Sequence, residues 1–163
     1  MASVNHQHWH LYYLDRTLAI EVLPIKQYLL QGWPIPAIVF ELSSPSLSSS
    51  DHEDQDNLLR SDITKMVKQA MAIIYFCLDS GQIAHNLFLT RTPSGSIRLF
   101  IWLLEPRFGL KDNLNINCAF CELSGYFIAK TQQLYQQLDE LECVRVLLDV
   151  ISRHEEVLHL LPS

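Results

Sequence analysis

Three histidines stand at alternate positions near the start of the chain. They are His6, His8 and His10, and Gln7 and Trp9 separate them. In an extended strand successive side chains point to opposite faces, so the three imidazoles line one face at intervals of about 6.6 Å. An imidazole changes its charge near neutral pH and acts as a base, a nucleophile or a metal ligand. The spacing therefore predicts a site where imidazoles meet a ligand or an anion.

Three interpretations of this histidine cluster compete. In the first, one imidazole attacks a phosphoanhydride and forms a phosphoramidate, while its neighbours donate hydrogen bonds to phosphoryl oxygens. In the second, the cluster binds zinc. That requires a fourth ligand from afar, and His6 and His10 lie about 13 Å apart along a strand. In the third, the histidines are ordinary strand residues with satisfied polar tips.

The sequence around the histidines resembles that of a known family. The segment Asn5–Leu14 resembles the His-x-His-x-His signature of the histidine-triad superfamily and, more narrowly, that of its GDP-hexose phosphorylases. Three later stretches are similar to segments of the animal enzymes, namely Ile83–Arg91, Phe108–Asp112 and Cys121–Tyr126. The resemblance extends from residue 2 to about residue 135.

The resemblance implies a nucleotidyltransferase that converts a GDP-hexose, GDP-D-glucose in the animal enzymes, and inorganic phosphate into GDP and hexose 1-phosphate. By this resemblance His8 attacks the α-phosphorus and carries a guanylyl group until phosphate removes it. His6 orients the strand and holds the tautomer of its neighbour. His10 contacts a phosphoryl or bridging oxygen. The scheme requires no metal and no cofactor.

Basic residues outside the histidine cluster are further candidates for phosphate contacts. They are Arg91, Arg98, Arg107 and Lys111. Guanidinium groups bind phosphate oxygens in a bidentate manner. Lys111, in a loop with Gly109, is the preferred candidate, followed by Arg91. The alternative for each of these residues is a solvated surface base.

Two other functions stay open. Members of the family are considerably longer, and the missing part precedes the histidines, so the chain is expected to be a C-terminal portion. An inactive remnant that binds nucleotide or serves as an interaction domain is the alternative. A hydrolase, with water in place of phosphate at the second step, is the third possibility. Since the missing part would contribute strands to the sheet, we expect an exposed sheet edge beside the histidine strand. Such edges favour self-association.

The composition excludes several classes of protein. A chain of 163 residues suits a single domain over residues 1–163. The net charge of −6 argues against a nucleic-acid partner. There is no apolar run of ~18 residues to span a membrane and no signal peptide. The four cysteines are therefore expected to be reduced in the cytoplasm, with the Cys118–Cys121 pair packed in the core.

The elements that position these residues follow from periodicity. Alternating or β-branched runs predict strands at Val4–Leu14, Ala37–Leu42, His85–Thr90, Ile97–Leu104 and Asn117–Ile128. Leu58–Leu78 is the clearest helix, and short helices follow from Thr131 onward. Ser43–Asp56 is expected to be a flexible loop. The sum is an α+β fold, a histidine-triad-like antiparallel sheet with helices on one face, incomplete at its N-terminal side.

Overall fold

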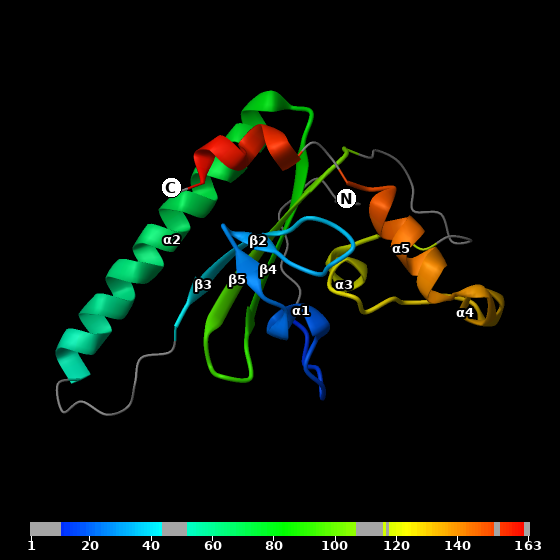
Figure 1. Ribbon diagram of the computed structural model, residues 1–163, viewed down its shortest axis with the longest axis horizontal. Coiled ribbons are helices and arrows are strands. Elements are labelled where there is room, and N and C mark those ends of the chain that lie inside the picture. Colours follow the sequence, from blue (N-terminus) through cyan, green and yellow to red (C-terminus); the bar gives the residue numbers. More distant parts are fainter. Residues whose placement is uncertain (1–10, 44–51, 107–115, 117, 152–153, 162–163) are drawn as a thin grey trace.

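The computed structural model describes residues 11–43, 52–106, 116, 118–151 and 154–161, except for the side chains of residues 52–55 and 154–156 (Figure 1). Helices and strands alternate irregularly along this part of the chain. In order they are α1 (Ala19–Val22), β1 (Ile25–Lys26), β2 (Leu29–Leu30), β3 (Ile38–Leu42), α2 (His52–Ser80), β4 (Ala84–Arg91), β5 (Ile97–Leu104), α3 (Phe120–Leu123), α4 (Gln132–Gln137), α5 (Glu140–Leu148) and the 3₁₀ helix η1 (His154–Leu160).

The strands form one five-stranded sheet in the order β1-β2-β3-β5-β4, and every neighbouring pair is antiparallel. The predicted hairpin is confirmed, since β4 and β5 pair from Ala84 opposite Leu104 to Arg91 opposite Ile97. The predicted strand before the long helix is confirmed as β3. In this order β5 lies between β3 and β4, and β4 ends the sheet on one side.

Side chains of β5 alternate between two buried faces. Phe100, Trp102 and Leu104 belong to one core cluster, and Ile101 and Leu103 belong to the other. We call the two sides of the sheet the Trp102 face and the Ile101 face. Both faces are apolar, so both must be covered by other elements.

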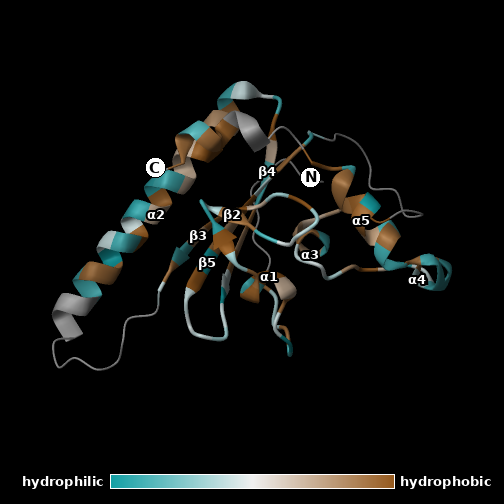
Figure 2. Ribbon diagram, viewed as in Figure 1, coloured by the Kyte–Doolittle hydropathy of each residue, from teal (hydrophilic) through white to brown (hydrophobic). Residues whose placement is uncertain are grey.

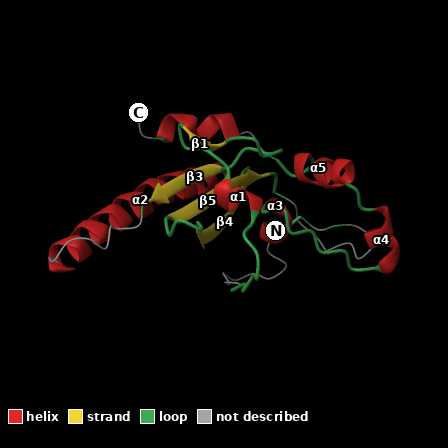
Figure 3. Cartoon of the chain, turned by 60° about the horizontal axis from the view of Figure 1, so that its bottom comes forward, coloured by secondary structure: helices red, strands yellow, loops and turns green. Residues whose placement is uncertain are grey.

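Helices accordingly cover both faces, and the expectation that they pack on one face is wrong. Residues of α1, α3 and α5 contribute to the cluster on the Trp102 face, among them Ile20, Leu123 and Leu147. Residues of α2 and η1 contribute to the cluster on the Ile101 face, among them Met66 and Val157. Figure 3 shows α2 on one side of the strands and α1 and α3 on the other.

The predicted long helix is confirmed as α2 and extends further toward the N-terminus than expected. Its buried residues Met66, Ala70, Ile73 and Cys77 recur at helical spacing, and Figure 2 shows the mixed polarity that results along this helix. The predicted loop through Asp56 is wrong from residue 52 onward, and residues 44–51 lie outside the described residues. Acidic residues at the start of a helix favour its positive end, and an anchored helix elongates cooperatively.

The predicted strand Asn117–Ile128 is wrong, because its centre forms the single turn α3. The Glu122 carboxylate accepts hydrogen bonds from the amide of Ala119 at 2.9 Å and from that of Ile128 at 3.4 Å. The buried carboxylate therefore closes a turn instead of interrupting a strand. Short helices do follow Thr131, as predicted, in α4, α5 and η1. Among the described helices, none combines the length and apolarity needed to cross a membrane.

Candidate functional site

The predicted histidine cluster lies outside the residues that the structure describes. This is true of His6, His8 and His10, and also of Arg107 and Lys111. The described chain begins at residue 11, directly after the third histidine. The contacts of Leu11–Leu14, which follow the cluster in the sequence, are described below.

The segment Leu11–Leu14 is not a strand, so this end of the predicted strand Val4–Leu14 is wrong. A strand needs hydrogen bonds from a neighbour, and none of the described strands pairs with these four residues. Their side chains nevertheless alternate. Leu11 and Tyr13 are 100% and 97% exposed, whereas Leu14 packs against the cluster of the Trp102 face and the ring of Tyr12 lies 4.5 Å from that of Phe120.

A series of packed aromatic rings connects this segment to the centre of the sheet. The ring of Phe120 stacks on Phe88 of β4 at 5.5 Å, and Phe88 lies 6.1 Å from Phe100 of β5. Phe100 then stacks on Trp102 at 5.5 Å with an interplanar angle of 12°. Such pairs stabilise the fold beyond the area they bury. The aromatic series, Tyr12–Phe120–Phe88–Phe100–Trp102, thus holds the end of the histidine segment against the Trp102 face.

Cys121, the second cysteine of the CxxC pair, contacts this anchor. Cys121 is a buried free thiol. Burial raises its pKa, although a hydrogen bond with Tyr12 acts in the opposite direction. Burial likewise raises the pKa of Tyr12, and the contact with Cys121 adds to that rise. A protonated thiol is a poor nucleophile and metal ligand. Within the described residues no three such side chains come together as a metal site.

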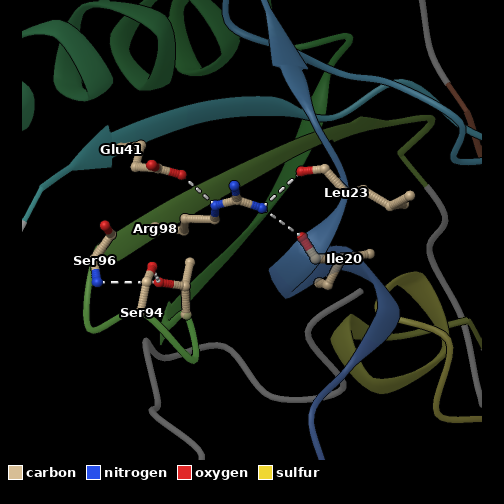
Figure 4. A network of polar contacts seen from close by, with 7 residues as sticks. Ile20, Leu23, Glu41, Ser94, Ser96 and Arg98 are labelled. Carbon is tan, nitrogen blue, oxygen red and sulfur yellow. Dashed lines mark hydrogen bonds and ion pairs between the residues drawn. The ribbon is translucent and has the colours of Figure 1, made fainter.

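Arg98, one of the candidate phosphate contacts, has a structural position (Figure 4). Its Nη1 donates hydrogen bonds to the carbonyl oxygens of Ile20 at 3.0 Å and Leu23 at 2.9 Å, and its Nε binds the carboxylate of Glu41. These carbonyls belong to the end of α1, where helical carbonyls lack partners within the helix. Arg98 therefore joins α1 to the central strands.

A second polar contact fixes α1 to the far end of β4. The carboxylate of Glu21 accepts a hydrogen bond from the hydroxyl of Thr90 and another from the amide of Leu18 at 2.9 Å. Thr90 lies opposite Arg98 in the hairpin register, so the two contacts share the same region of the Trp102 face. Together they place α1 beside the C-terminal end of β4.

Arg91, the remaining described candidate, projects from the other side of β4, as does His85. Odd-numbered residues of β4 share the Ile101 face with Leu87. Arg91 is exposed, and its Nη1 donates to the carbonyl of Gly95 in the hairpin turn at 2.8 Å. His85 is half-buried, and burial lowers its pKa, so the imidazole is neutral at neutral pH.

One pair of polar groups escaped the sequence analysis. Asn86 lies directly opposite Trp102 in the hairpin, so both side chains share the Trp102 face. The indole Nε1 of Trp102 is buried without a hydrogen-bond partner. Asn86 is half-buried, and within the described residues its side chain makes no hydrogen bond. The signal that could have identified this pair is the register of the predicted hairpin, which places Asn86 opposite Trp102.

Comparison with known proteins identifies relatives over most of the chain. The family model described as "GDPGP1-like, C-terminal domain" matches residues 16–159. GDP-D-glucose phosphorylase 1 of Macaca fascicularis is 32% identical over 166 aligned positions, which cover 91% of this chain and 39% of that protein. The protein of the same name from Homo sapiens is 31% identical with the same coverage, and that from Danio rerio is 30% identical over 94% of this chain and 43% of its own length.

The chain therefore spans roughly two fifths of the length of these relatives. No solved structure matches the chain significantly.

Proposed function

The chain belongs to the family of GDPGP1-like C-terminal domains, and on that premise we propose that it serves the phosphorolysis of GDP-D-glucose. In this reaction inorganic phosphate and GDP-D-glucose give GDP and glucose 1-phosphate. The observation that carries the proposal is the 31–32% identity, over 91% of this chain, to proteins named GDP-D-glucose phosphorylase 1. The histidine cluster ends at His10, five residues short of the part of the chain that the family model matches, which begins at residue 16.

His8 supplies the nucleophile in the proposed mechanism. A neutral imidazole, with an ordinary pKa of about 6.5, is largely the free base at neutral pH. Its lone pair attacks the α-phosphorus, a nitrogen–phosphorus bond forms, and the bond to the bridging oxygen breaks. Glucose 1-phosphate leaves with that electron pair. An oxygen of inorganic phosphate then attacks the same phosphorus, GDP forms, and the imidazole is regenerated.

The other two histidines stabilise charge and position the nucleophile. His10 donates a hydrogen bond to a phosphoryl or bridging oxygen, where negative charge grows in the transition state. His6 hydrogen-bonds within the strand and fixes the tautomer of its neighbour. The aromatic series supports this arrangement, because it anchors Tyr12, two residues after His10, on the sheet. A rigid anchor next to the reacting groups reduces the entropy that is lost on reaching the transition state.

A His8→Asn substitution tests the proposal. The chain is incubated with GDP-D-glucose and phosphate, and GDP and glucose 1-phosphate are measured by chromatography. We expect a loss of at least about 10³-fold, since removal of the nucleophile removes about 4 kcal/mol of transition-state stabilisation. The matched control is His159→Asn, at an exposed histidine of η1, which should leave the rate unchanged.

Trapping the intermediate adds a second readout. Without phosphate, substrate labelled in the guanosine part should leave an acid-labile label on the wild-type protein and none on His8→Asn. Phosphorolysis together with a labelled protein in the His8→Asn variant would refute the mechanism. Release of free GMP without phosphate would instead identify a hydrolase.

A second candidate function is nucleotide binding without turnover. The comparisons support a shared domain, since the aligned part covers 39% of the first relatives. Calorimetric titration with GDP distinguishes the two: saturable binding without product formation supports the binding domain.

A further inference from the structure

The helix α2 has a second apolar stripe besides the one that packs on the sheet. It consists of side chains at intervals of three or four residues, namely Val67, Met71, Tyr75 and Leu78. Three of them are largely exposed: Val67 by 46%, Tyr75 by 58% and Leu78 by 61%. We call these four residues the outer stripe. We propose that two copies of the chain pair through it, with their α2 helices antiparallel. This pairing does not depend on the reaction proposed above.

No described element of the same chain covers the outer stripe. The inner side chains of α2 belong to the cluster on the Ile101 face, among them Met66, Ala70, Ile73 and Cys77. At 3.6 residues per turn, the outer stripe is centred about 125° away from them around the helix. The 3₁₀ helix η1 contacts α2 on another side, where the ring of His159 lies 5.9 Å from that of Phe76. Figure 1 shows α2 at the margin of the molecule, so the outer stripe is open to another chain.

Charges beside the outer stripe favour a second copy of the same chain in the antiparallel direction. Lys65 and Lys68 flank the stripe near its N-terminal end, and Asp79 flanks it on the same side at its C-terminal end. All three side chains are exposed, and within the described residues none of them forms an ion pair. Antiparallel pairing brings the lysines of each copy to Asp79 of the other, whereas parallel pairing places like charges side by side. The flank is therefore complementary to itself.

The positions of these charged residues also determine the register of the pair. A two-fold axis directly after Met71 places Tyr75 of one copy opposite Lys68 of the other. An ammonium group over an aromatic ring is a favourable contact. The same axis brings Asp79 of one copy within one residue of the position opposite Lys65. The two helices then overlap over about four turns, a length of about 22 Å.

An open hollow on the surface of α2 lies where Asp79 of the second copy arrives in this register. Its volume is about 380 Å³, and it is lined by Ser61, Thr64, Lys65, Lys68 and Gln69. Two ammonium groups and a side-chain amide at this place donate hydrogen bonds to a carboxylate. The hollow therefore suits an acidic side chain, which is the group that the antiparallel pairing supplies.

Sedimentation equilibrium of the whole chain tests the pairing. We expect a monomer–dimer equilibrium whose dissociation constant rises at least about tenfold in Leu78→Ser, because each dimer loses two leucine side chains from its interface. The matched control is Leu58→Ser, at an exposed leucine of the same helix outside the overlap, and it should leave the dissociation constant unchanged. Circular dichroism checks that both variants are folded like the wild type.

Charge reversal tests the direction of the helices. Lys65→Glu combined with Lys68→Glu should weaken the dimer at least about fivefold, since both side chains then repel Asp79 of the second copy. Addition of Asp79→Lys should restore the affinity. Lys26→Glu, at an exposed lysine of β1, is the control and should have no effect.

A cysteine at the two-fold axis tests the register. Met71→Cys should link two copies by a disulfide under mild oxidation, because a disulfide requires Cα atoms within about 7 Å of each other. Leu78→Cys should not, since its two copies lie about 20 Å apart along the helices. The wild type, which has four free cysteines, is oxidised in parallel as the control.

Several outcomes would overturn the pairing. One is a chain that stays monomeric at about 1 mM, where even a contact with a Kd of about 1 mM is populated; the outer stripe would then belong to a different partner. Another is a dimer that Leu78→Ser does not weaken, because it would assign self-association to another surface, such as a sheet edge. Efficient cross-linking of Leu78→Cys would indicate parallel helices and would refute the antiparallel direction.

Discussion

Replacing Arg98 with Met should destabilise the fold by about 4 kcal/mol. The substitution removes two hydrogen bonds from a charged donor to the carbonyls of Ile20 and Leu23, each of which contributes about 1.5 kcal/mol at the low end of the usual range. It also removes the ion pair with Glu41, whose side chain is 33% exposed, so we assign this pair about 1 kcal/mol. Small domains are stable by roughly 5–15 kcal/mol, so the loss is large.

Urea unfolding followed by circular dichroism measures this loss. With a slope of about 2 kcal/mol per molar urea, the midpoint should fall by about 2 M. Arg98→Lys keeps the charge but not the planar fork, and should recover only part of the loss. Arg16→Met is the control, because Arg16 is exposed and, among the described residues, its ion pair is with the adjacent, exposed Asp15. A midpoint shift below about 0.5 M for Arg98→Met would refute the structural role and return Arg98 to the list of phosphate ligands.

Two further predictions concern stability. Gly125→Ala should cost about 2–4 kcal/mol, since Gly125 has a φ of +92° and a new Cβ would lie 2.8 Å from the Trp33 ring. Gly81→Ala, with open space around it, should cost only about 1 kcal/mol, and equal urea midpoints for the two variants would contradict this. Burial raises the pKa of Cys77 from 9.0 to about 11. The folded state then keeps a proton that the unfolded state releases, so stability should fall as the pH rises from 9 toward 11. Cys77→Ala should show a shallower slope, because the buried thiol of Cys121 still contributes to it, and an identical slope in both proteins would assign the effect to other groups.

The sequence predicted the elements whose signals are local. The β4–β5 hairpin follows from two β-rich runs around Thr92–Ser96, and the centre of α2 follows from its apolar period. Both signals lie within one segment, and both elements are confirmed. The expectation that helices cover only one face of the sheet is wrong. The consecutive apolar residues of β5 are typical of a strand buried on both faces, so the sequence does carry a signal for helices on both sides.

The parts that the sequence did not predict depend on contacts between distant segments. The run Asn117–Ile128 is apolar enough for a strand, but Glu122 in its centre binds two amides and Trp33 donates to the carbonyl of Leu123 at 3.0 Å. Neither contact is visible from local periodicity. Arg98 is a similar case. The sequence does not show that the β3–β5 register places Glu41 beside it, and without that contact Arg98 resembles a phosphate ligand.

Polar groups on the Trp102 face are distributed unevenly along β4, and this distribution separates scaffold from site. At the C-terminal end, Thr90 and Arg98 have partners in α1 and β3. At the N-terminal end, the amide of Asn86 and the indole of Trp102 have no partner within the described residues. Buried polar groups are normally satisfied, so an unsatisfied group indicates a position that another part of the chain or a ligand fills. The C-terminal end of β4 thus serves to hold α1, whereas the Asn86 end is the part of this face whose polar groups are left unsatisfied by the described residues.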